Sequence, residues 1–529
     1  MEVREIEKWC CVVQVLDAFS SEKPASCSGV IVHRQTGTVI CSGVPFARFA
    51  TDKRSLSSDH GFLSPHSFSD TLKIRVSFPT ERDASPPSAC ETSRHREVTA
   101  ELLMLVSCPE FKRAFRAVFQ ETDRWRFHAD KEEEEEEEDD ELMGDALSLS
   151  WFAVLKANVG AAGGPDAGGV VVPWRGGSSL RKGLPVVACG SPFGSLCVDL
   201  FGASLSAGIL SNLCGEGNAV ILTDARCLPG AEGGGLFAAE APDDARLLGL
   251  IVSPFGWKAN EWIGLTLACS VDVIFRSVAR CRGVGDPLRG VWPDPREAGP
   301  LAVPCGTRGA RGPAVCFVDS GAFWGSGVVV APRLVVTCRH VVNGRSKVGL
   351  KFHHGDRVQD VSGDVLFATN AASSYDLALV KLRDSVTEAV VPCMTQSYNP
   401  GESVLVVGYG GLGRKCGPSL TRGVLSKTIR FNDQPVMLQT TCAVQAGTSG
   451  GAVVRTRTGE LLGIVSSNTR DFAAKVTYPH LNFSIPVAVF QRLLQRFHQT
   501  KDVNVFSVLD STDKEVSRVW RLQSAQSKL

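Results

Sequence analysis

The sequence predicts a mainly β protein in which one β-rich domain fold is used twice along the chain. Short β-branched runs alternate with turn residues, as in GVVVAPRLVVTC (327–338) and SVLVVGYG (403–410). This pattern is typical of the short strands of a barrel or sandwich. Glycine is abundant, with 52 residues to supply turns. Segments of the first half also reappear, in the same order, in the second half.

The internal repeat consists of five pairs of similar segments. They are CSGVIVHRQTGTVICSGV (27–44) with GSGVVVAPRLVVTCRHVV (325–342), FAVLK (152–156) with LALVK (377–381), LSAGILS (205–211) with LTRGVLS (420–426), TDARCLPGAEGGGLF (223–237) with TTCAVQAGTSGGAVV (440–454), and LLGLIVS (247–253) with LLGIVSS (461–467). Short β-rich segments resemble one another by chance, but their shared order argues for a duplicated fold.

The repeat and the composition together predict the domain boundaries. The first domain spans 1–280, and a Pro-, Gly- and Arg-rich linker spans 281–312. The second domain spans 313–500, and 501–529 is a C-terminal tail. Within the first domain, the run KEEEEEEEDDE (131–141) repels itself, which indicates a solvated inserted loop rather than an acidic docking site.

One helix is evident near the end of the second domain. Phe490, Leu493, Leu494 and Phe497 recur at helical spacing after Pro486, which suits a helix start. We expect this helix to pack on the β domain.

Composition excludes several classes of function. Lys plus Arg and Asp plus Glu are equal at 56 each, so no net field favours nucleic acid. No apolar run is long enough for a membrane span, and the acidic N-terminus is unlike a secretory signal. The 18 cysteines show no metal-ligand spacing, so we expect reduced thiols, no metal and no cofactor.

The stretch QAGTSGGAVV (445–454) raises the question of catalysis. Ser449 could be a plain hydroxyl in a glycine-rich turn, or a nucleophile that needs a base and an orienting acid. Upstream, His340 ends the strand-like run LVVTCRH, and Asp376 precedes the strand LALVKL. Each residue alone has an ordinary surface or turn interpretation, but their order and settings together favour catalysis.

The segment 313–500 resembles a trypsin-like serine protease domain of the compact HtrA-like kind, with a chymotrypsin-like double β-barrel. The resemblance rests on TCRH, YDLALV and GTSGG. It implies that Ser449 is the nucleophile, His340 the general base and then acid, and Asp376 the residue that orients it. It also implies an oxyanion hole formed by the backbone N–H groups of Gly447 and Ser449.

Two departures from digestive trypsins bear on activation and specificity. Thr448 stands where those enzymes carry an acid, and no IVGG-like start precedes the domain, so activation by a new N-terminus is not expected. Ala443 replaces the carboxylate of the trypsin pocket, which predicts a small, uncharged substrate side chain. By the resemblance, Ser466, Ser467 and Asn468 pair with the substrate as an added strand.

The first copy lacks the three candidate catalytic side chains. Val44 or a neighbour falls at the histidine position, Trp151 at the aspartate position and Glu232 at the serine position. The first domain is therefore predicted to be a degenerate, structural or regulatory pseudo-protease domain. No segment of the size of a PDZ domain follows the late helix, unlike in many HtrA-like proteins.

The last residues, Ser527, Lys528 and Leu529, form an SKL tripeptide, a peroxisomal address read by an import receptor. With the degenerate first copy, this resembles a family of peroxisomal processing proteases. The resemblance implies a matrix endopeptidase that removes N-terminal targeting leaders after cysteine and processes imported enzymes of fatty-acid β-oxidation. A second copy of the same chain is a further candidate partner. The alternatives are an inactive protease-shaped scaffold and, opposed by the N-terminus and the SKL, a secreted digestive protease.

A candidate self-cleavage site lies in the first domain. The segment DASPPSACETSRHRE (83–97) combines proline, serine and charge, as exposed connections do. If cysteine is preferred at P1, the Cys90-Glu91 bond is a potential substrate. An incidental loop thiol is an equally good interpretation.

Overall fold

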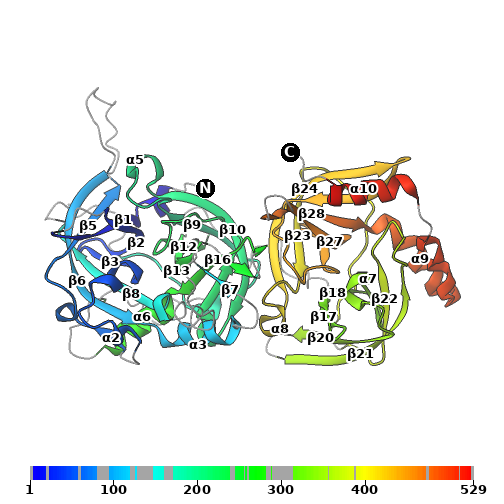
Figure 1. The fold of residues 1–529 in the computed structure, drawn as a ribbon, viewed down its shortest axis with the longest axis horizontal. Coiled ribbons are helices and arrows are strands. Elements are labelled where there is room, and N and C mark those ends of the chain that lie inside the picture. Colours follow the sequence, from blue (N-terminus) through cyan, green and yellow to red (C-terminus); the bar gives the residue numbers. More distant parts are fainter. Residues whose placement is uncertain are drawn as a thin grey trace, which may run out of the picture. The chain divides into compact units, whose positions relative to one another are not determined.

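The structure is a computed structural model. It describes residues 4–19, 23–57, 61–79, 95–119, 125–127, 147–159, 171–238, 245–254, 256–258, 261–281, 288, 314–354, 357–386, 389–471, 476–510 and 513–525. The chain forms two compact units (Figure 1). Unit 1 comprises Met1–Ala259 and Leu265–Ala302, and unit 2 comprises Asn260–Gly264 and Val303–Leu529.

Unit 2 contains two closed six-stranded barrels. The first barrel has the strand order β17-β18-β19-β22-β21-β20, and the second has the order β23-β24-β25-β28-β27-β26. The strands of the first are β17 (Val315–Asp319), β18 (Trp324–Ala331), β19 (Leu334–Thr337), β20 (Lys347–His354), β21 (Arg357–Ala368) and β22 (Ala378–Leu382). Those of the second are β23 (Ser403–Gly408), β24 (Ser419–Phe431), β25 (Gln434–Thr440), β26 (Ala452–Arg455), β27 (Leu461–Asp471) and β28 (Val476–Pro486).

Unit 1 repeats this strand order. Its first sheet runs β4-β6-β5-β1-β2-β3-β8, and β6 also pairs with β8, so six strands close into a ring. Its second barrel runs β10-β11-β16-β13-β12-β9, which is the same cyclic order as in unit 2. The ring strands are β1 (Cys10–Asp17), β2 (Ala25–His33), β3 (Thr38–Ser42), β5 (Leu72–Pro79), β6 (His95–Ser107) and β8 (Trp151–Ala157), with β4 (Phe62–Leu63) at the edge. The barrel strands are β9 (Pro185–Gly190), β10 (Ser204–Cys214), β11 (Val220–Thr223), β12 (Gly235–Ala238), β13 (Arg246–Ser253) and β16 (Thr266–Ser270).

The remaining elements are short strands and helices outside the barrels. Strands β7 (Trp125–Arg126) and β14 (Trp257–Lys258) pair antiparallel, and β15 (Glu261–Trp262) is a further short strand. The helices before β17 are α1 (Arg4–Glu7), η1 (Val44–Phe49), α2 (Arg54–Ser57), η2 (Pro65–Ser67), α3 (Pro109–Val118), η4 (Gly177–Ser179), α5 (Val198–Phe201), η5 (Glu216–Asn218) and α6 (Val271–Arg280). Those after it are α7 (Arg339–Val342), α8 (Gly413–Cys416), α9 (Val487–Thr500), η6 (Val503–Asp510) and α10 (Lys514–Ala525).

The runs of apolar residues in unit 2 are explained by burial on both faces of the strands. In β17, Cys316 and Val318 belong to the core of the first barrel, whereas Val315 and Phe317 belong to a second core that also contains residues of the other barrel. Because successive side chains of a strand point to opposite faces, both sets are buried and the strand reads as continuously apolar.

The predicted fold class is confirmed: the protein is mainly β and built of closed barrels. The predicted late helix is α9, which follows Pro486 and buries Phe490 and Leu494. The residues after 500, which the sequence assigned to a tail, instead contain η6 and α10. Phe506 and Leu509 of η6 are buried in the same core as α9.

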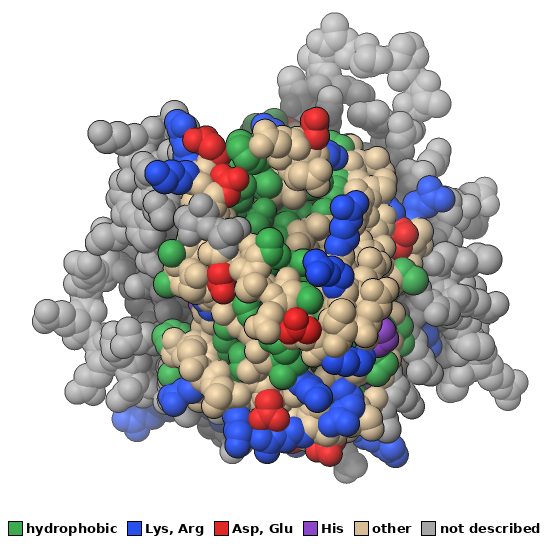
Figure 2. Space-filling view, turned by 90° about the vertical axis from the view of Figure 1, so that its right-hand side faces the viewer, with side chains coloured by type: hydrophobic (Ala, Val, Ile, Leu, Met, Phe, Trp, Pro, Cys, Tyr) green, Lys and Arg blue, Asp and Glu red, His purple; other side chains and the backbone are tan. Residues whose placement is uncertain are grey.

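The cysteines, the helices and the surface charges of the described residues bear on the expectations from composition. Every cysteine in the described ranges is a free thiol. No helix there is long and apolar enough to cross a membrane. On the face drawn in Figure 2, Lys and Arg side chains stand beside Asp and Glu side chains.

Candidate active site

His340 and Asp376 are joined by two hydrogen bonds. The backbone N–H of His340 donates to Oδ1 of Asp376 over 3.0 Å, and Nδ1 of His340 is hydrogen-bonded to Oδ2. The carboxylate therefore holds both the backbone and the ring of the histidine. An imidazole bound at Nδ1 in this way keeps its Nε2 for proton transfer.

Strand pairing explains why these two residues meet. Strands β19 and β22 are antiparallel, with Thr337 opposite Ala378. His340 lies three residues after Thr337, in the one-turn helix α7. Asp376 lies two residues before Ala378, so both side chains emerge at the same end of the strand pair.

The Asp376 carboxylate is kept ionised by its neighbours. Burial alone would raise its pKa, but the hydrogen bonds and charge of His340, with a smaller contribution from Arg339, lower the pKa below its usual value. Nε of Arg339 lies 3.4 Å from Oδ1 of Asp376. Asp376 is thus suited to remain an anion that orients the histidine.

Ser449 lies in a tight loop between β25 and β26, which we call the serine loop (residues 445–451). Its Oγ donates to the carbonyl oxygen of Ser466 over 3.2 Å. Gly447 has φ +91° and Gly450 has φ +86°, conformations that a side chain disfavours. A Cβ on Gly447 would lie 2.1 Å from the Trp324 ring, and the loop therefore needs glycine there.

Ser326 of β18 fixes the serine loop from the other barrel. Its Oγ donates to the carbonyl oxygen of Gly447 over 2.9 Å, and its N–H donates to that of Ser449 over 2.8 Å. The same Oγ accepts the N–H of Tyr409 over 2.7 Å. Ser326 is fully buried, and its bonds fix the carbonyl groups of both residues predicted to form the oxyanion hole.

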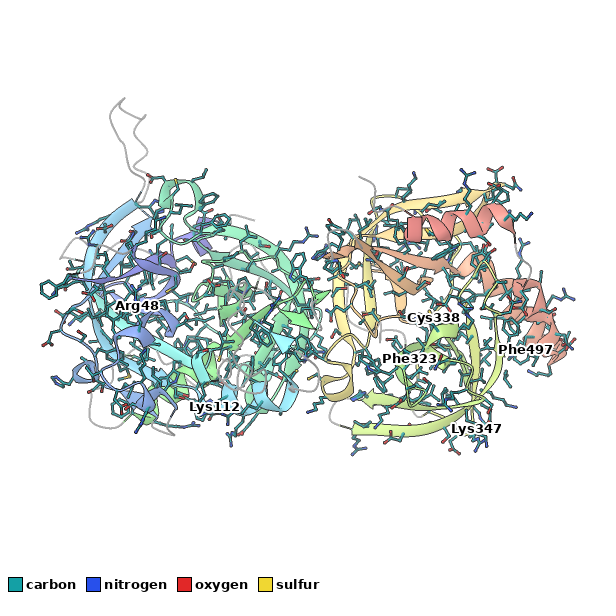
Figure 3. All side chains as sticks on the ribbon, in the orientation of Figure 1. Arg48, Lys112, Phe323, Cys338, Lys347 and Phe497 are labelled. Carbon is teal, nitrogen blue, oxygen red and sulfur yellow. The ribbon has the colours of Figure 1, made fainter. Side chains whose placement is uncertain are left out.

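Two further contacts bring the histidine and serine segments together. A Cβ on Gly325 would lie 2.6 Å from Cγ2 of Val341 and 2.9 Å from the carbonyl oxygen of Ser449. The residue after the histidine and the backbone of the serine thus both pack on Gly325. Cys338, labelled in Figure 3, donates its thiol to the carbonyl oxygen of Val465, which also accepts the N–H of Gly450.

Comparisons with known proteins identify the kind of domain that contains these residues. The trypsin-like peptidase domain family matches residues 325–464, a range that includes His340, Asp376 and Ser449. A peroxisomal leader peptide-processing protease of Mus musculus is 40% identical over 565 residues, which is 100% of this chain and 98% of the relative. The Homo sapiens protein of the same name is 39% identical over 566 residues, 98% of this chain and 97% of the relative.

The chain belongs to the family of peroxisomal leader peptide-processing proteases. Among solved structures, the serine endoprotease from Yersinia pestis is 26% identical, covering 36% of this chain and 64% of that chain with a TM-score of 0.29. Unit 2 of this family member carries the trypsin-like serine peptidase domain.

The strand registers define the equivalent positions in unit 1. Gly29 lies opposite Cys41, as Gly327 lies opposite Thr337, so Val44 falls at the position of His340. Cys41 in turn lies opposite Ala153, as Thr337 lies opposite Ala378, so Trp151 falls at the position of Asp376.

The position in unit 1 that is equivalent to Ser449 follows from hydrogen bonds that both units contain. Ser28 donates its N–H to the carbonyl oxygen of Glu232 over 2.9 Å and its Oγ to that of Gly230 over 2.7 Å. Its Oγ accepts the N–H of Ser191 over 2.8 Å. Ser28 thus repeats the three bonds of Ser326, and Glu232 stands at the position of Ser449.

Unit 1 repeats the left-handed backbone of the serine loop. Gly230, equivalent to Gly447, has φ +93°, and its N–H donates to a carboxylate oxygen of Glu232 over 2.7 Å. The side chain that replaces the serine therefore places its own negative charge on the amide. In unit 1 this loop conformation thus presents an N–H group to a carboxylate oxygen.

The predicted substrate-binding residues lie around the serine loop. Ala443 is buried, with its carbonyl oxygen bound by the Thr421 hydroxyl over 2.8 Å. Ser466 accepts from Ser449, and Ser467 and Asn468 follow it in β27, opposite Phe483 and Asn482 of β28. The Asn468 side chain lies outside the described part.

Strand β26 pairs with only part of β27. In the described residues, β26 pairs with β27 only as far as Ile464. A strand-like substrate along residues 466–468 is compatible with this register.

One group of three residues in the described part could bind a metal. The ligand atoms of Cys338, His340 and Asp376 lie within 4.8 Å of one another. Burial and the charge of Asp376 raise the pKa of Cys338 well above its usual value, which opposes the thiolate that a metal needs. Both oxygens of Asp376 already bind His340. The group suits a catalytic hydrogen-bond network better than a metal centre.

Several predicted features lie outside the described residues. They are the acidic run 131–141, most of the linker 281–312, the candidate self-cleavage pair Cys90 and Glu91, and the tripeptide Ser527, Lys528 and Leu529.

Three contributors to the site are not evident from the sequence. Arg339 contacts the aspartate, and Ser326 orients the serine loop. Asn482 is fully buried and donates to the carbonyl oxygens of Thr440 and Cys442, next to Ala443. The one available signal was the pair of matching segments CSG and GSG, whose shared serine is Ser28 or Ser326.

Proposed function

We propose that unit 2 is a serine endopeptidase in which Ser449 is the nucleophile, His340 the general base and Asp376 its orienting acid. The observation that supports it most is the pair of hydrogen bonds between Asp376 and His340. Ser449 is carried by a loop whose left-handed backbone requires glycine. A weakly nucleophilic hydroxyl needs such a pair for activation.

The proposed reaction follows from these roles. Ser449 Oγ attacks the scissile carbonyl carbon while His340 Nε2 takes its proton, and Asp376 stabilises the resulting imidazolium. The N–H groups of Gly447 and Ser449 receive the negative charge that develops on the carbonyl oxygen. His340 then protonates the leaving amine, and water, activated by the same histidine, hydrolyses the acyl-enzyme. These steps use side chains, backbone and water, without a cofactor.

The proposed substrates are N-terminal leader peptides of peroxisomal proteins. Support comes from the names of the two relatives that match nearly the whole chain. Cleavage after cysteine is compatible with an uncharged Ala443, because a small pocket residue without charge accepts a small, weakly polar side chain. Enzymes of fatty-acid β-oxidation are proposed as further substrates.

Peroxisomal matrix location is proposed on the same support from the relatives' names. The SKL tripeptide is the candidate address for the import receptor. Removing Ser527, Lys528 and Leu529 from a tagged full chain tests it: the tag should become cytosolic, and unchanged import would place the address elsewhere. Self-cleavage at Cys90-Glu91 is also proposed, and intact masses of wild type and Ser449→Ala over a range of concentrations test it. Self-association is a separate proposal, and the molar mass of the protein in solution tests it.

Unit 1 is proposed to be a pseudo-protease domain with a structural or regulatory role. Val44 and Trp151 supply neither base nor orienting acid, and the Glu232 carboxylate binds the amide that would otherwise receive the substrate oxygen. A substrate carbonyl would have to displace an ionised side chain there.

The deciding experiment incubates a leader-bearing peroxisomal precursor with wild type and with Ser449→Ala. Wild type should remove the leader, and the variant should lose the activity while keeping its fold by circular dichroism. If neither protein cleaves, an inactive scaffold is the better account. If both cleave, Ser449 is not the nucleophile.

A further inference from the structure

Two C-terminal helices pack on the loop that carries Asp376. We call η6 and α10 together the C-terminal clamp, and residues 369–377, between β21 and β22, the acid loop. Asp376 itself contacts His340, but the other side of the acid loop faces the clamp. The contacts between the two are polar at the loop and apolar beneath it.

Helix η6 binds the start of the acid loop. The N–H of Asn370 donates to Oδ1 of Asp510 over 2.7 Å, and the Ser373 hydroxyl donates to the carbonyl oxygen of Leu509 over 2.6 Å. The Ser373 hydroxyl also accepts the N–H of Tyr375 over 3.1 Å. The end of η6 therefore fixes the acid loop at two points, three and six residues before Asp376.

The segment around α10 binds the end of the acid loop. The Ser374 hydroxyl lies 3.1 Å from the carbonyl oxygen of Asp513 and 2.8 Å from the hydroxyl of Ser517. The ring of Tyr375 meets that of Trp520 edge to face, with centroids 6.4 Å apart. Ser374 and Tyr375 directly precede Asp376, so this contact adjoins the candidate catalytic residue.

An apolar anchor holds the clamp in place. Phe506 of η6 is buried, and its ring centroid lies 5.7 Å from that of Phe367 and 5.5 Å from that of Phe497. Phe367 belongs to β21, which leads into the acid loop, and Phe497, labelled in Figure 3, belongs to α9. The clamp is thus part of the core of unit 2.

The acid loop transmits these contacts to the histidine. The carbonyl oxygen of Asn370 accepts from Arg339, over 3.2 Å, and Arg339 adjoins His340 and contacts Asp376. The Thr369 hydroxyl donates to the carbonyl oxygen of Tyr375 over 2.8 Å, which closes the base of the loop. A shift of the loop would therefore move the carboxylate relative to the imidazole.

We propose that the C-terminal clamp is a positioning device for the proposed reaction, and that Asp510, Ser373 and Ser374 are positioning residues for Asp376. The proposal rests on the proposed function of unit 2. Its physical basis is that orienting the imidazole requires the carboxylate to be held within a fraction of an ångström, and an isolated connection between two strands is not rigid enough.

The test compares two aspartates of the same segment. Asp510→Ala removes the acceptor of the Asn370 N–H. Asp502→Ala is the matched control, because Asp502 accepts only within its own turn, from the N–H of Asn504 over 2.9 Å. In the full chain, Asp510→Ala should lower kcat on the leader-bearing precursor by about tenfold or more with KM nearly unchanged. Asp502→Ala should leave both constants unchanged.

A conservative variant separates positioning from loss of fold. Asp510→Asn keeps a carbonyl oxygen that can accept the Asn370 N–H, so its kcat should stay close to that of wild type. If Asp510→Ala proves unstable, Ser374→Ala provides the same test. Its control is Ser507→Ala, since the Ser507 hydroxyl bonds only within η6, to the carbonyl oxygen of Asn504.

A double-mutant cycle gives a readout that general destabilisation would not move. The rate at which a fluorophosphonate labels Ser449 is measured for Asp510→Ala, Asp376→Asn and the double variant. If the clamp acts through Asp376, adding Asp510→Ala to Asp376→Asn should cause little further loss. Losses that multiply would overturn the proposal, as would equal kcat for Asp510→Ala and Asp502→Ala.

The same labelling experiment distinguishes failure of the proposed function from failure of the clamp proposal. If the fluorophosphonate does not label Ser449 in wild type, the serine protease assignment fails, and the clamp proposal fails with it. If wild type is labelled and Asp510→Ala is labelled at the same rate, only the clamp proposal fails.

Discussion

Single side chains at this site act mainly by fixing the backbone of others. Ser326 contributes no group to the proposed reaction, yet its hydroxyl and N–H bind the carbonyl oxygens of Gly447 and Ser449. That Ser28 makes the same three bonds in unit 1 indicates that they belong to the loop conformation itself. The anion-binding amide is then a consequence of that conformation.

Removing the Ser326 hydroxyl should therefore impair catalysis. Ser326→Ala leaves the Gly447 carbonyl without its donor and the buried Tyr409 N–H without its acceptor, at a cost of about 1–3 kcal/mol of stability. We expect kcat to fall by about tenfold or more, with a small change in KM, because the loop that carries the oxyanion donors loses a hydrogen bond that holds it. Steady-state kinetics and thermal unfolding measure both effects.

The control for this prediction has the same bonding chemistry elsewhere. Ser320 donates its hydroxyl to the carbonyl oxygen of Phe323 over 2.8 Å and accepts the Phe323 N–H, but within the β17–β18 turn. Ser320→Ala should lower the melting temperature by a similar or smaller amount and leave kcat unchanged. Equal losses of kcat in both variants would contradict a role for Ser326 in the serine loop.

The ionisation of Asp376 predicts a pH dependence of stability. Because the folded-state pKa lies below the ordinary value of about 4, the ionised carboxylate stabilises the fold. This contribution is complete above that value and is lost as the pH falls through the lowered pKa. The melting temperature of wild type should exceed that of Asp376→Asn at neutral pH, and the gap should narrow below pH of about 4. A constant gap would argue against ionisation as its source.

At the scale of the elements, turns decide whether the site can form. The serine loop needs left-handed backbone at Gly447 and close packing against Trp324. The acid loop needs the clamp. Both loops join barrel strands whose register already places their ends close together, and the strands supply rigidity that the loops lack.

Gly447→Ala should abolish activity through sterics as well as backbone strain. A Cβ would lie 2.1 Å from the Trp324 ring and 2.6 Å from the Tyr409 carbonyl oxygen, so the loop must move. Gly401 is the matched control: it has φ +86°, but nothing lies within 4 Å of an added Cβ. Gly401→Ala should cost only about 1–2 kcal/mol of backbone strain and retain activity. Full activity in Gly447→Ala, measured on the precursor, would contradict the loop assignment.

Features that depend on residues close together in the sequence could be predicted, whereas contacts between residues far apart in the sequence could not. Strand runs and helix α9 follow from local periodicity, and comparison of the chain with itself indicated the duplicated fold. The role of Ser326 was not predictable, because its partners Tyr409 and Gly447 lie 83 and 121 residues away. The clamp was not predictable for the same reason, because Ser373 and Ser374 of the acid loop bind partners that lie 136 and 139 residues away.

For the whole molecule, duplication produced two copies of one architecture with different chemistry. Both units keep the barrel order, the serine that orients the loop and the left-handed glycine. Unit 1 differs at the three positions where a protease needs base, acid and nucleophile. Its loop binds the Glu232 carboxylate, so the retained shape serves the fold of unit 1 without requiring a substrate.

The full chain should therefore carry one reactive serine. A fluorophosphonate should label wild type at Ser449 alone, and Ser449→Ala should remain unlabelled. Introducing a serine into unit 1 with Glu232→Ser, in the Ser449→Ala background, should not restore labelling. Without a histidine at the position of Val44 or an acid at that of Trp151, nothing accepts the proton of the new hydroxyl. Peptide mapping of the labelled protein measures this, and a label on residue 232 would mean that unit 1 contains a base that its strand registers do not reveal.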